Sequence, residues 1–366
     1  MSSNDDRIQE VEIMAPINIA LVKYWGKRNE NLMLPLNDSI SLSINDVYAK
    51  TIVRIGPSIK KDSVSINGSD VCLSKHPGYL RCFSIVSETS FPIKAGLASS
   101  AAGFAAIAYG LGQIYQLSIS DIVRVARMGS GSACRSILSG LVHWKAGTAE
   151  DGSDCICETV FLEDYWPTLR SIILVTSHDA KEVGSSIGMQ LTVKTSKLLQ
   201  ARLKSAFLKK DFEELAEVIM SDSGQLHALC MDTLPSLKYL SDNSWYLMRL
   251  IHALNRYCKS TKVAYTFDAG PNCCLFLESV NVPLILAAIN KYCNLPSDLI
   301  EQLAQCSAAF EYENLKSLVE EEQKNLLLLE SMCGEESRAI EPMEGVVKDI
   351  FLSCVGAGPT ILTKSR

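Results

Sequence analysis

The chain has 366 residues, of which 47% are apolar and 21% are charged, so it is long enough for two or three domain-sized units with sizeable cores. This composition excludes disorder over most of the length. The 35 Lys and Arg against 41 Asp and Glu give a net charge of -6, which argues against nucleic acid or an anionic membrane as a partner. An anionic ligand therefore needs a locally positive pocket.

The cysteine pattern and the N-terminus predict a cytoplasmic protein that enters no membrane. The thirteen cysteines are scattered and form no C-x-x-C pairs at zinc spacing, which favours reduced, mostly buried thiols. The first residues are acidic and have neither the apolar core of a signal peptide nor the arginine-rich pattern of a transit peptide. Residues 95–120 are uncharged, but Gly, Ala and Ser dominate them, so they are too weakly apolar to span a bilayer.

The first ninety residues predict β-strands. Residues 11–24 are mostly apolar, residues 40–55 are rich in β-branched side chains, and residues 63–68 alternate before a turn. A buried helix is predicted next, over residues 100–115, because apolar residues recur there at helical spacing: Phe104, Ile107, Ala108, Leu111, Ile114 and Tyr115. Glycines in the same stretch imply close packing against a neighbour.

The rest of the chain predicts an α+β fold. Helices are expected over residues 119–128, 133–138, roughly 188–229 and 283–292, and strands over residues 140–144, 171–176, 263–267 and 273–277. The character of the sequence changes near residues 178–190. We therefore expect two lobes, residues 1–185 and residues 186–366.

The first segment that can carry chemistry is residues 91–103, where a Gly-containing loop leads directly into the predicted apolar helix. The unpaired N–H groups and the dipole of a helix N-terminus attract anions, and the hydroxyls of Ser99 and Ser100 can add donors or reach a metal ion. The spacing is not that of a Walker A loop. On this segment alone, a serine that only caps a core helix is an equal alternative.

The second segment, residues 15–27, reads as an apolar strand that ends in Lys23, Tyr24, Trp25 and Lys27. Two ammonium groups four residues apart repel each other unless an anion lies between them, and a phosphate ligand would meet that need. The alternative is a strand that leaves the core with ordinary surface lysines.

The third segment, residues 129–136, places Ser130, Ser132 and Arg135 around another small-residue helix start. A guanidinium group is a planar fork that can hold a carboxylate or a phosphate with two parallel hydrogen bonds. The alternative is an arginine that only forms an ion pair with an aspartate.

In the fourth segment, residues 266–272, Asp268 stands where an apolar strand breaks into a turn. From this position a carboxylate can project into a cleft and accept the proton of a substrate hydroxyl. Asp-x-Gly-Pro is also a common turn, so a purely structural role stays open. His178 and Asp179 also follow a strand, but no third residue has ligand spacing, and we interpret them as loop residues.

In this order, these segments resemble the mevalonate diphosphate decarboxylase family of the GHMP small-molecule kinase superfamily. The matching blocks are residues 15–43, 91–106, 129–144, 184–190, 265–276 and 355–362. The resemblance implies a two-lobed α+β fold with mixed sheets flanked by helices around a deep cleft. It also implies ATP-dependent conversion of mevalonate 5-diphosphate to isopentenyl diphosphate, ADP, phosphate and CO2, a step of isoprenoid and sterol precursor biosynthesis.

The resemblance also implies roles for particular residues. The lobe of residues 1–185 would hold the ATP phosphates, on Gly96, Leu97, Ala98, Ser99, Ser100 and Ala101. Ser100 would also meet a magnesium ion that arrives with ATP, and Asp268 in the second lobe would be the catalytic carboxylate, acting with Lys23, Arg135 and Ser100. The groups expected to bind the substrate are Asn18, Tyr24, Trp25, Lys27, Ser130, Ser132, Arg135, Ser185 and Ser186. A homodimer is expected in addition.

Two other activities stay open. One is a related kinase of the phosphomevalonate type, whose phosphorylated product is stable, and the other is a catalytically silent ligand sensor. Residues 129–135 and 268–272 favour decarboxylation. Lys94 occupies a loop position that is often small and neutral in relatives, and it either adds to the phosphate site or points to solvent. Residues 56–78 match the family poorly, so we assign no adenine contacts.

Overall fold

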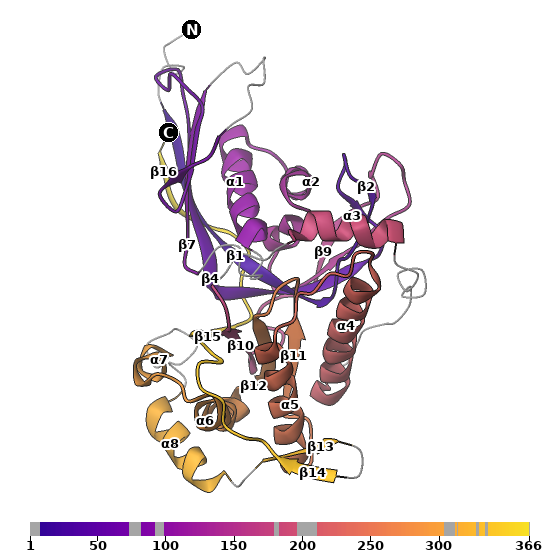
Figure 1. The fold of residues 1–366 in the computed structure, drawn as a ribbon. Coiled ribbons are helices and arrows are strands. Elements are labelled where there is room, and N and C mark those ends of the chain that lie inside the picture. Colours follow the sequence, from indigo (N-terminus) through magenta and orange to yellow (C-terminus); the bar gives the residue numbers. More distant parts are fainter. Residues whose placement is uncertain are drawn as a thin grey trace.

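The computed structural model describes residues 8–72, 82–91, 99–178, 183–195, 211–303, 312, 314–326, 329–333 and 336–365. The protein has two lobes, one built on a large sheet and one on a four-stranded sheet, with helices packed against each (Figure 1). The expected α+β class is confirmed. None of the helices in these ranges combines the length and the apolar character needed to cross a membrane.

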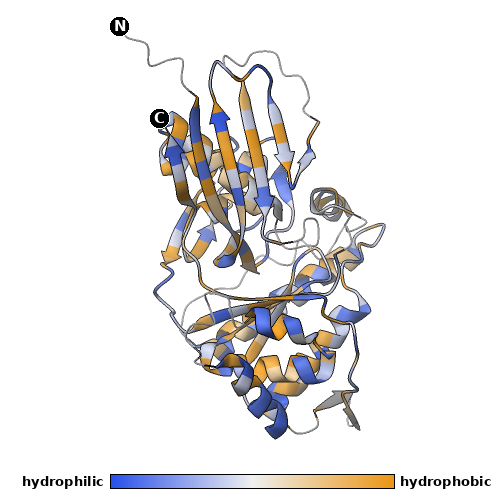
Figure 2. Ribbon diagram, turned by 90° about the vertical axis from the view of Figure 1, so that its left-hand side faces the viewer, coloured by the Kyte–Doolittle hydropathy of each residue, from blue (hydrophilic) through white to orange (hydrophobic). Residues whose placement is uncertain are grey.

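The described part of the large sheet has eight strands. Six lie in the order β16–β1–β4–β7–β5–β6, and β8 and β9 continue from β4. All pairings are antiparallel except that of β5 with β7. The strands are β1 (Gln9–Val22), β4 (Ser39–Ile55), β5 (Ser63–Ile66), β6 (Ser69–Asp70), β7 (Phe83–Thr89), β8 (Leu141–Trp144), β9 (Cys157–Phe161) and β16 (Thr360–Ser365), and a separate hairpin is formed by β2 (Lys27–Asn29) and β3 (Leu34–Pro35). Figure 2 shows hydrophilic and hydrophobic residues alternating along these strands, as expected for a sheet with one covered face.

Helix α1 (Ser99–Tyr115) covers the large sheet, and α2 (Ile119–Gly129) and the 3-10 helix η1 (Gly131–Ile137) follow it. The helix is where it was predicted, but its predicted buried face is wrong in part. Phe104 and Tyr115 are 42% and 57% exposed, whereas the alanines within residues 101–108 are buried. A Cβ added at Gly110 would stand 2.8 Å from the side chain of Val53. The small residues let the helix approach the strands closely, which leaves Phe104 and Tyr115 exposed. The predicted apolar residues Ile107, Leu111 and Ile114 do pack against the sheet, at the cluster of Val53, Ile55 and Ile85.

The second sheet is antiparallel, in the order β11–β12–β10–β15. Its strands are β10 (Leu169–Val175), β11 (Val263–Phe267), β12 (Cys273–Glu278) and β15 (Asp349–Cys354). The helices of the second half are α3 (Ser185–Thr195), α4 (Phe212–Asp232), α5 (Asp242–Tyr257), α6 (Val282–Cys293), α7 (Ser297–Leu303) and α8 (Leu315–Asn325), with a 3-10 turn η3 (Ser279–Asn281) and a hairpin of β13 (Glu330–Cys333) and β14 (Glu336–Ala339). The helix predicted over residues 188–229 is observed as α3 and α4, and part of the stretch between them lies outside the described ranges.

Strand β1 belongs to the cores of both lobes. Its residues Ile17, Ile19 and Leu21 lie in one buried cluster with Ile173 of β10 and Phe276 of β12. The sheets also do not follow the predicted boundary at residue 185. Strand β10 precedes it but pairs within the second sheet, and β16 follows it but pairs with β1 of the large sheet. The division of the chain at residue 185 therefore stays a prediction.

Candidate active site

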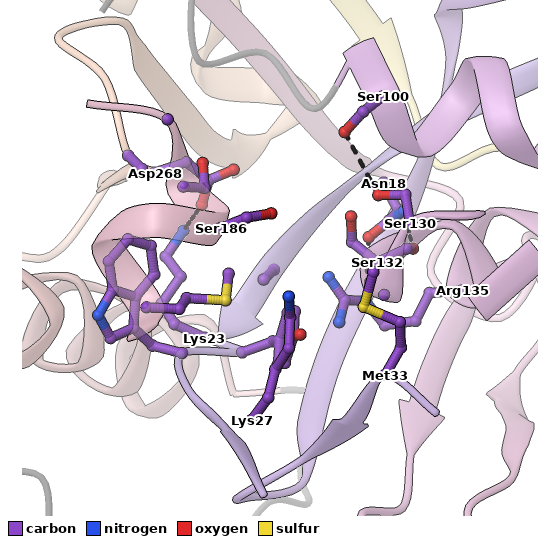
Figure 3. A pocket seen from close by; sticks show the side chains of 18 of the residues that line it. Asn18, Lys23, Lys27, Met33, Ser100, Ser130, Ser132, Arg135, Ser186 and Asp268 are labelled. Carbon is purple, nitrogen blue, oxygen red and sulfur yellow. Dashed lines mark hydrogen bonds and ion pairs between the residues drawn. The ribbon is translucent and has the colours of Figure 1, made fainter. Parts of the chain in front are cut away.

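A cavity of about 600 Å³ lies where the end of β1 meets the starts of α1, η1 and α3 and the turn between β11 and β12. This volume is within the range of small-molecule sites. The predicted site residues that line it are Asn18, Lys23, Tyr24, Trp25, Lys27, Ser100, Ser130, Ser132, Arg135, Ser185, Ser186 and Asp268. Figure 3 shows two opposite walls, a lysine wall with Lys23 and Asp268 and an arginine wall with Asn18, Ser130, Ser132 and Arg135.

Some predicted positions are not placed around this cavity. Outside the described residues lie Gly96, Leu97, Ala98, Lys94 and Asp179. Of Ser99, the structure describes only the place in the backbone, at the start of α1. Ala101 is fully buried and is not among the residues that line the cavity. His178 is an exposed residue after β10 and is not among the residues that line the cavity.

Lys23 reaches the cavity because β1 is irregular just before its end. Asn18 and Ala20 line the cavity, as alternate residues of one strand face do. Strict alternation would send Lys23 to the opposite face together with Leu21. The register with β4 shifts between Ala20 and Val22, however, and a β-bulge of this kind re-aims the side chains that follow it. The bulge thus returns Lys23 to the cavity side.

Lys23 and Asp268 form an ion pair that joins the two lobes. The Nζ atom of Lys23 lies 2.5 Å from Oδ1 of Asp268, and the two side chains are 2% and 28% exposed. The lysine is therefore enclosed, whereas the aspartate faces the cavity. The turn after β11 holds Asp268 in place, because the N–H of Gly270 donates to its carbonyl at 2.8 Å.

Lys27 has a carboxylate partner of its own. Its Nζ atom lies 2.8 Å from Oε2 of Glu30. The repulsion expected between Lys23 and Lys27 is relieved by these two protein carboxylates, so it does not by itself require a phosphate. The side chain of Glu30 is 41% exposed, which leaves this carboxylate able to move away when an anion approaches Lys27.

Arg135 is fixed by neutral partners. Its Nε donates to Oδ1 of Asn18 and its Nη1 to the hydroxyl of Ser39, both at 3.0 Å, and the guanidinium lies 5.5 Å from the ring centre of Trp144. Asn18 in turn donates to the carbonyl of Ser132 at 3.0 Å. Burial lowers the pKa of Arg135. Within the described residues no carboxylate pairs with it, which disfavours the alternative of an arginine in a simple ion pair.

The two aromatic residues after Lys23 are used differently. The Tyr24 hydroxyl is buried and has no hydrogen-bond partner among the described residues, and burial raises the pKa of this phenol, so it stays a neutral donor. A Cβ at Gly131 would stand 2.9 Å from that hydroxyl. The Trp25 indole instead donates to Thr192 Oγ1 at 3.0 Å. Tyr24 is thus an unused donor beside the cavity, whereas Trp25 shapes its wall.

The N-terminus of α1 opens on the cavity beside two hydroxyls. Ser100 is exposed, and its Oγ lies 3.3 Å from that of Ser130. A Cβ added at Gly103, nearly one turn further, would meet no atom within 4 Å. Open space, a helix N-terminus and hydroxyl groups together suit phosphate oxygens. Over the ranges that the structure describes, no group of three or more His, Cys, Asp or Glu residues is arranged to hold a metal ion.

Sequence reasoning missed several residues around the cavity. Met33, Phe104 and Leu226 line its apolar part, although Phe104 was expected in the core. His227 is 4% exposed, and burial together with the charge of Lys23 lowers its pKa to about 4, against the opposing effect of Asp268. Met33 lies in the turn of the β2–β3 hairpin with a left-handed φ of 51°.

Comparisons with known proteins agree with this geometry. The family model of the diphosphomevalonate decarboxylase-like N-terminal domain matches residues 15–157, and that of the mevalonate 5-diphosphate decarboxylase C-terminal domain matches residues 171–362. Diphosphomevalonate decarboxylase of Homo sapiens is 36% identical over 98% of this chain and 95% of its own length. The relative of the same name from Saccharomyces cerevisiae is 39% identical over 78% of this chain and 82% of its own length.

Solved structures show the same likeness. Mevalonate diphosphate decarboxylase from Trypanosoma brucei superposes with a TM-score of 0.80 at 31% identity, over 97% of this chain and 98% of that one. A crystal structure of mevalonate 5-diphosphate decarboxylase gives a TM-score of 0.81 at 34% identity, over 98% of both chains. The fold and site thus define an enzyme of the GHMP-kinase fold. The chain belongs to the mevalonate 5-diphosphate decarboxylase family.

Proposed function

We propose that this chain converts mevalonate 5-diphosphate and ATP to isopentenyl diphosphate, ADP, phosphate and CO2. The observation that supports it most directly is that the Lys23–Asp268 pair faces Arg135 across one cavity. A β-hydroxy acid presents a hydroxyl and a carboxylate a few bonds apart. The lysine wall offers a carboxylate for the hydroxyl, and the arginine wall offers a guanidinium for the acid.

The chemistry requires both walls. The tertiary 3-hydroxyl is a poor leaving group, so the γ-phosphoryl of ATP is transferred to its oxygen while Asp268 accepts the hydroxyl proton. The C3–O bond then breaks, and phosphate leaves with the electron pair. The electrons of the C1–C2 bond form the new C2–C3 double bond as CO2 departs.

On the lysine wall, Asp268 aligns the hydroxyl and accepts its proton. Once that proton has passed to the departing phosphate, the carboxylate offers negative charge to the cationic C3. Lys23, 2.5 Å away, orients that carboxylate and offers positive charge to the phosphate oxygens as charge moves. Because the lysine is almost fully enclosed, water screens this interaction little.

On the arginine wall, Arg135 orients the substrate carboxylate and does not stabilise it strongly. Decarboxylation disperses the charge of that carboxylate, so a grip tighter before the reaction than during it would raise the barrier. The bonds from Nε and Nη1 to Asn18 and Ser39 hold the guanidinium plane and leave the Nη2 edge for the ligand. A fixed plane with few remaining donors suits orientation.

The remaining groups bind phosphate. The N-terminus of α1 with Ser99, Ser100 and the loop before them holds the nucleotide phosphates. Magnesium, when bound, neutralises phosphate charge, and Ser100 is the side chain here that can meet it, because the described residues offer no carboxylate cage. The substrate diphosphate and the mevalonyl part lie against Tyr24, Lys27, Ser130, Ser132, Ser185 and Ser186.

The test measures three products in one reaction. Purified protein with ATP, magnesium and mevalonate 5-diphosphate labelled at C1 should release labelled CO2, phosphate and ADP in equal amounts. Formation of ADP with a stable phosphorylated product and no CO2 would indicate the kinase alternative. Binding of both substrates without ADP would indicate the silent sensor.

We also propose a cytosolic homodimer. All cysteines whose side chains the structure describes are free thiols, which suits a reducing compartment. The dimer rests on the family resemblance. Sedimentation equilibrium should give twice the mass of the chain, and a fluorescent fusion should distribute through the cytosol.

A further inference from the structure

The middle of helix α4 carries polar residues on a buried face, next to the lysine wall. Asp222 is 9% exposed and Ser223 is 1% exposed, among apolar buried neighbours such as Ile219 and Leu226. Neither Asp222 nor Ser223 lines the cavity. These polar groups can therefore act on the site only through residues that do line it.

Asp222 accepts a hydrogen bond from the backbone of Lys23, and Ser223 accepts one from the backbone of the residue before Asp268. The N–H of Lys23 donates to Oδ2 of Asp222 at 2.7 Å. The N–H of Phe267, the residue before Asp268, donates to Oγ of Ser223 at 2.9 Å. Two consecutive residues of α4 thus bind the backbone of Lys23 in one lobe and of Phe267 in the other.

Both points are the places where a strand ends. β1 ends at Val22, one residue before Lys23, and β11 ends at Phe267, one residue before Asp268. Lys23 lies one residue beyond β1, and Phe267 is the last residue of β11, an edge strand of the second sheet, so an acceptor outside the sheet ladder takes each N–H. Asp222 and Ser223 are consecutive residues of one helix, and the spacing of their side chains therefore sets the spacing of the two strand ends.

We propose that Asp222 and Ser223 are positioning residues that hold Lys23 and Asp268 at the separation that the reaction needs, an inference that rests on the proposed function. The ion pair alone does not fix this geometry, because a lysine side chain reaches a carboxylate from many backbone positions. Misplacement of a reacting group by about 1 Å can cost about 100-fold in rate. A positioning role thus predicts a loss of kcat with little change in KM.

The experiment removes one side-chain acceptor of a backbone N–H and compares the result with the loss of a buried hydrogen bond elsewhere. Ser223→Ala deletes the bond to Phe267, and Ser223→Thr keeps a hydroxyl. Ser87→Ala is the control, because Ser87 is buried in β7 and its hydroxyl lies 2.9 Å from that of Thr51, away from the cavity. For Asp222, Asn keeps an acceptor oxygen and Ala does not.

The expected result is a fall in kcat of about 10- to 100-fold for Ser223→Ala and Asp222→Ala, with KM for both substrates within about 3-fold of the wild type. Ser223→Thr and Asp222→Asn should recover most of kcat. Ser87→Ala should lower the melting temperature but not kcat. A Ser223→Ala enzyme that loses no more kcat than Ser87→Ala would overturn the proposal.

A second readout separates this inference from the proposed function. A wild type that releases no CO2 contradicts the proposed function alone. In that case crystal structures decide the positioning role. A changed separation of the Lys23 and Asp268 Cα atoms in Ser223→Ala supports it, and an unchanged Cα separation overturns it. Should Ser223→Ala fail to fold, Ser223→Cys, which keeps the volume with a weaker acceptor, is judged by the same criteria.

Discussion

The two walls of the cavity each carry a buried cation, but, in the part of the chain that the structure describes, a carboxylate of the protein neutralises only the lysine. Lys23 on the lysine wall is paired with a carboxylate of the protein at 2.5 Å. Arg135 on the arginine wall is held by an amide, a hydroxyl and an aromatic ring, and within the described residues no carboxylate neutralises it. A buried charge without a counterion is costly, so the arginine wall gains from an anionic ligand, whereas the lysine wall is balanced without one.

This difference separates binding from reaction. The arginine wall can attract and orient a carboxylate because its charge is not neutralised by the protein. The lysine wall brings a base beside the place where a hydroxyl must lie. Substitutions on the arginine wall should therefore change KM more than kcat, and substitutions on the lysine wall should do the reverse.

The largest effect is expected for Asp268→Asn. An amide cannot accept the hydroxyl proton, so kcat should fall about 1000-fold while substrate dissociation constants stay within about 3-fold. Rapid-quench kinetics and calorimetric binding measure the two quantities. Glu301→Gln, which breaks an exposed ion pair with Lys316 at 2.9 Å, is the matched control and should retain full activity. Retention of a tenth of wild-type turnover by Asp268→Asn would remove Asp268 from its role.

Arg135→Lys is expected to have the next largest effect. The charge is kept, but the ammonium group cannot bond Asn18 and Ser39 and still present a planar edge to the ligand. We expect kcat/KM to fall about 50-fold, mostly through KM for mevalonate 5-diphosphate, as steady-state kinetics with saturating ATP would show. A lysine variant with unchanged KM would mean that the arginine wall does not bind the substrate.

His227 tests the lysine wall through pH. Its pKa falls from 6.5 in the unfolded chain to about 4 in the fold, so the unfolded state takes up a proton first as the pH drops. The contribution of the neutral His227 to the free energy of unfolding is complete above pH 6.5 and decreases as the pH falls from 6.5 to 4. The free energy of unfolding is measured by denaturation at pH 7 and at pH 5. Between these two pH values, the wild type should lose about 2 kcal/mol more than His227→Gln. Equal losses would contradict a neutral, buried His227.

The smallest effect is expected for Tyr24→Phe. The hydroxyl has no hydrogen-bond partner among the described residues, so its removal should leave the melting temperature unchanged or raise it. If the hydroxyl binds the substrate, KM for mevalonate 5-diphosphate should rise about 10-fold. A lower melting temperature with an unchanged KM would instead assign this hydroxyl a structural role.

The features that could be predicted from the sequence are those set by local pattern. The strands β1 and β4 follow from apolar and β-branched composition, and the turn that carries Asp268 follows from its turn residues. The segments around Lys23 and Arg135 could be identified before their contacts were known. The buried face of α1 could not be predicted, because it depends on how closely the sheet approaches Gly110.

Other features of the site depend on contacts between distant parts of the chain. The bulge after Ala20 is a property of the pairing with β4, which no single strand encodes. The bond from Lys23 to Asp222 joins residues 199 positions apart, and the helical pattern of α4 gives no sign of it. Sequence reasoning therefore indicated which residues carry chemistry but not what holds them in position.

The return of β16 to the large sheet makes the two lobes interdependent during synthesis. β1 is made early, but one of its edges stays open until residues 360–365 have left the ribosome and paired with it. Until then, that edge presents unpaired backbone groups, which favour aggregation. A fragment cut at residue 185 would keep this open edge and would take β10 away from its partners. Expression of either half alone should therefore give insoluble material.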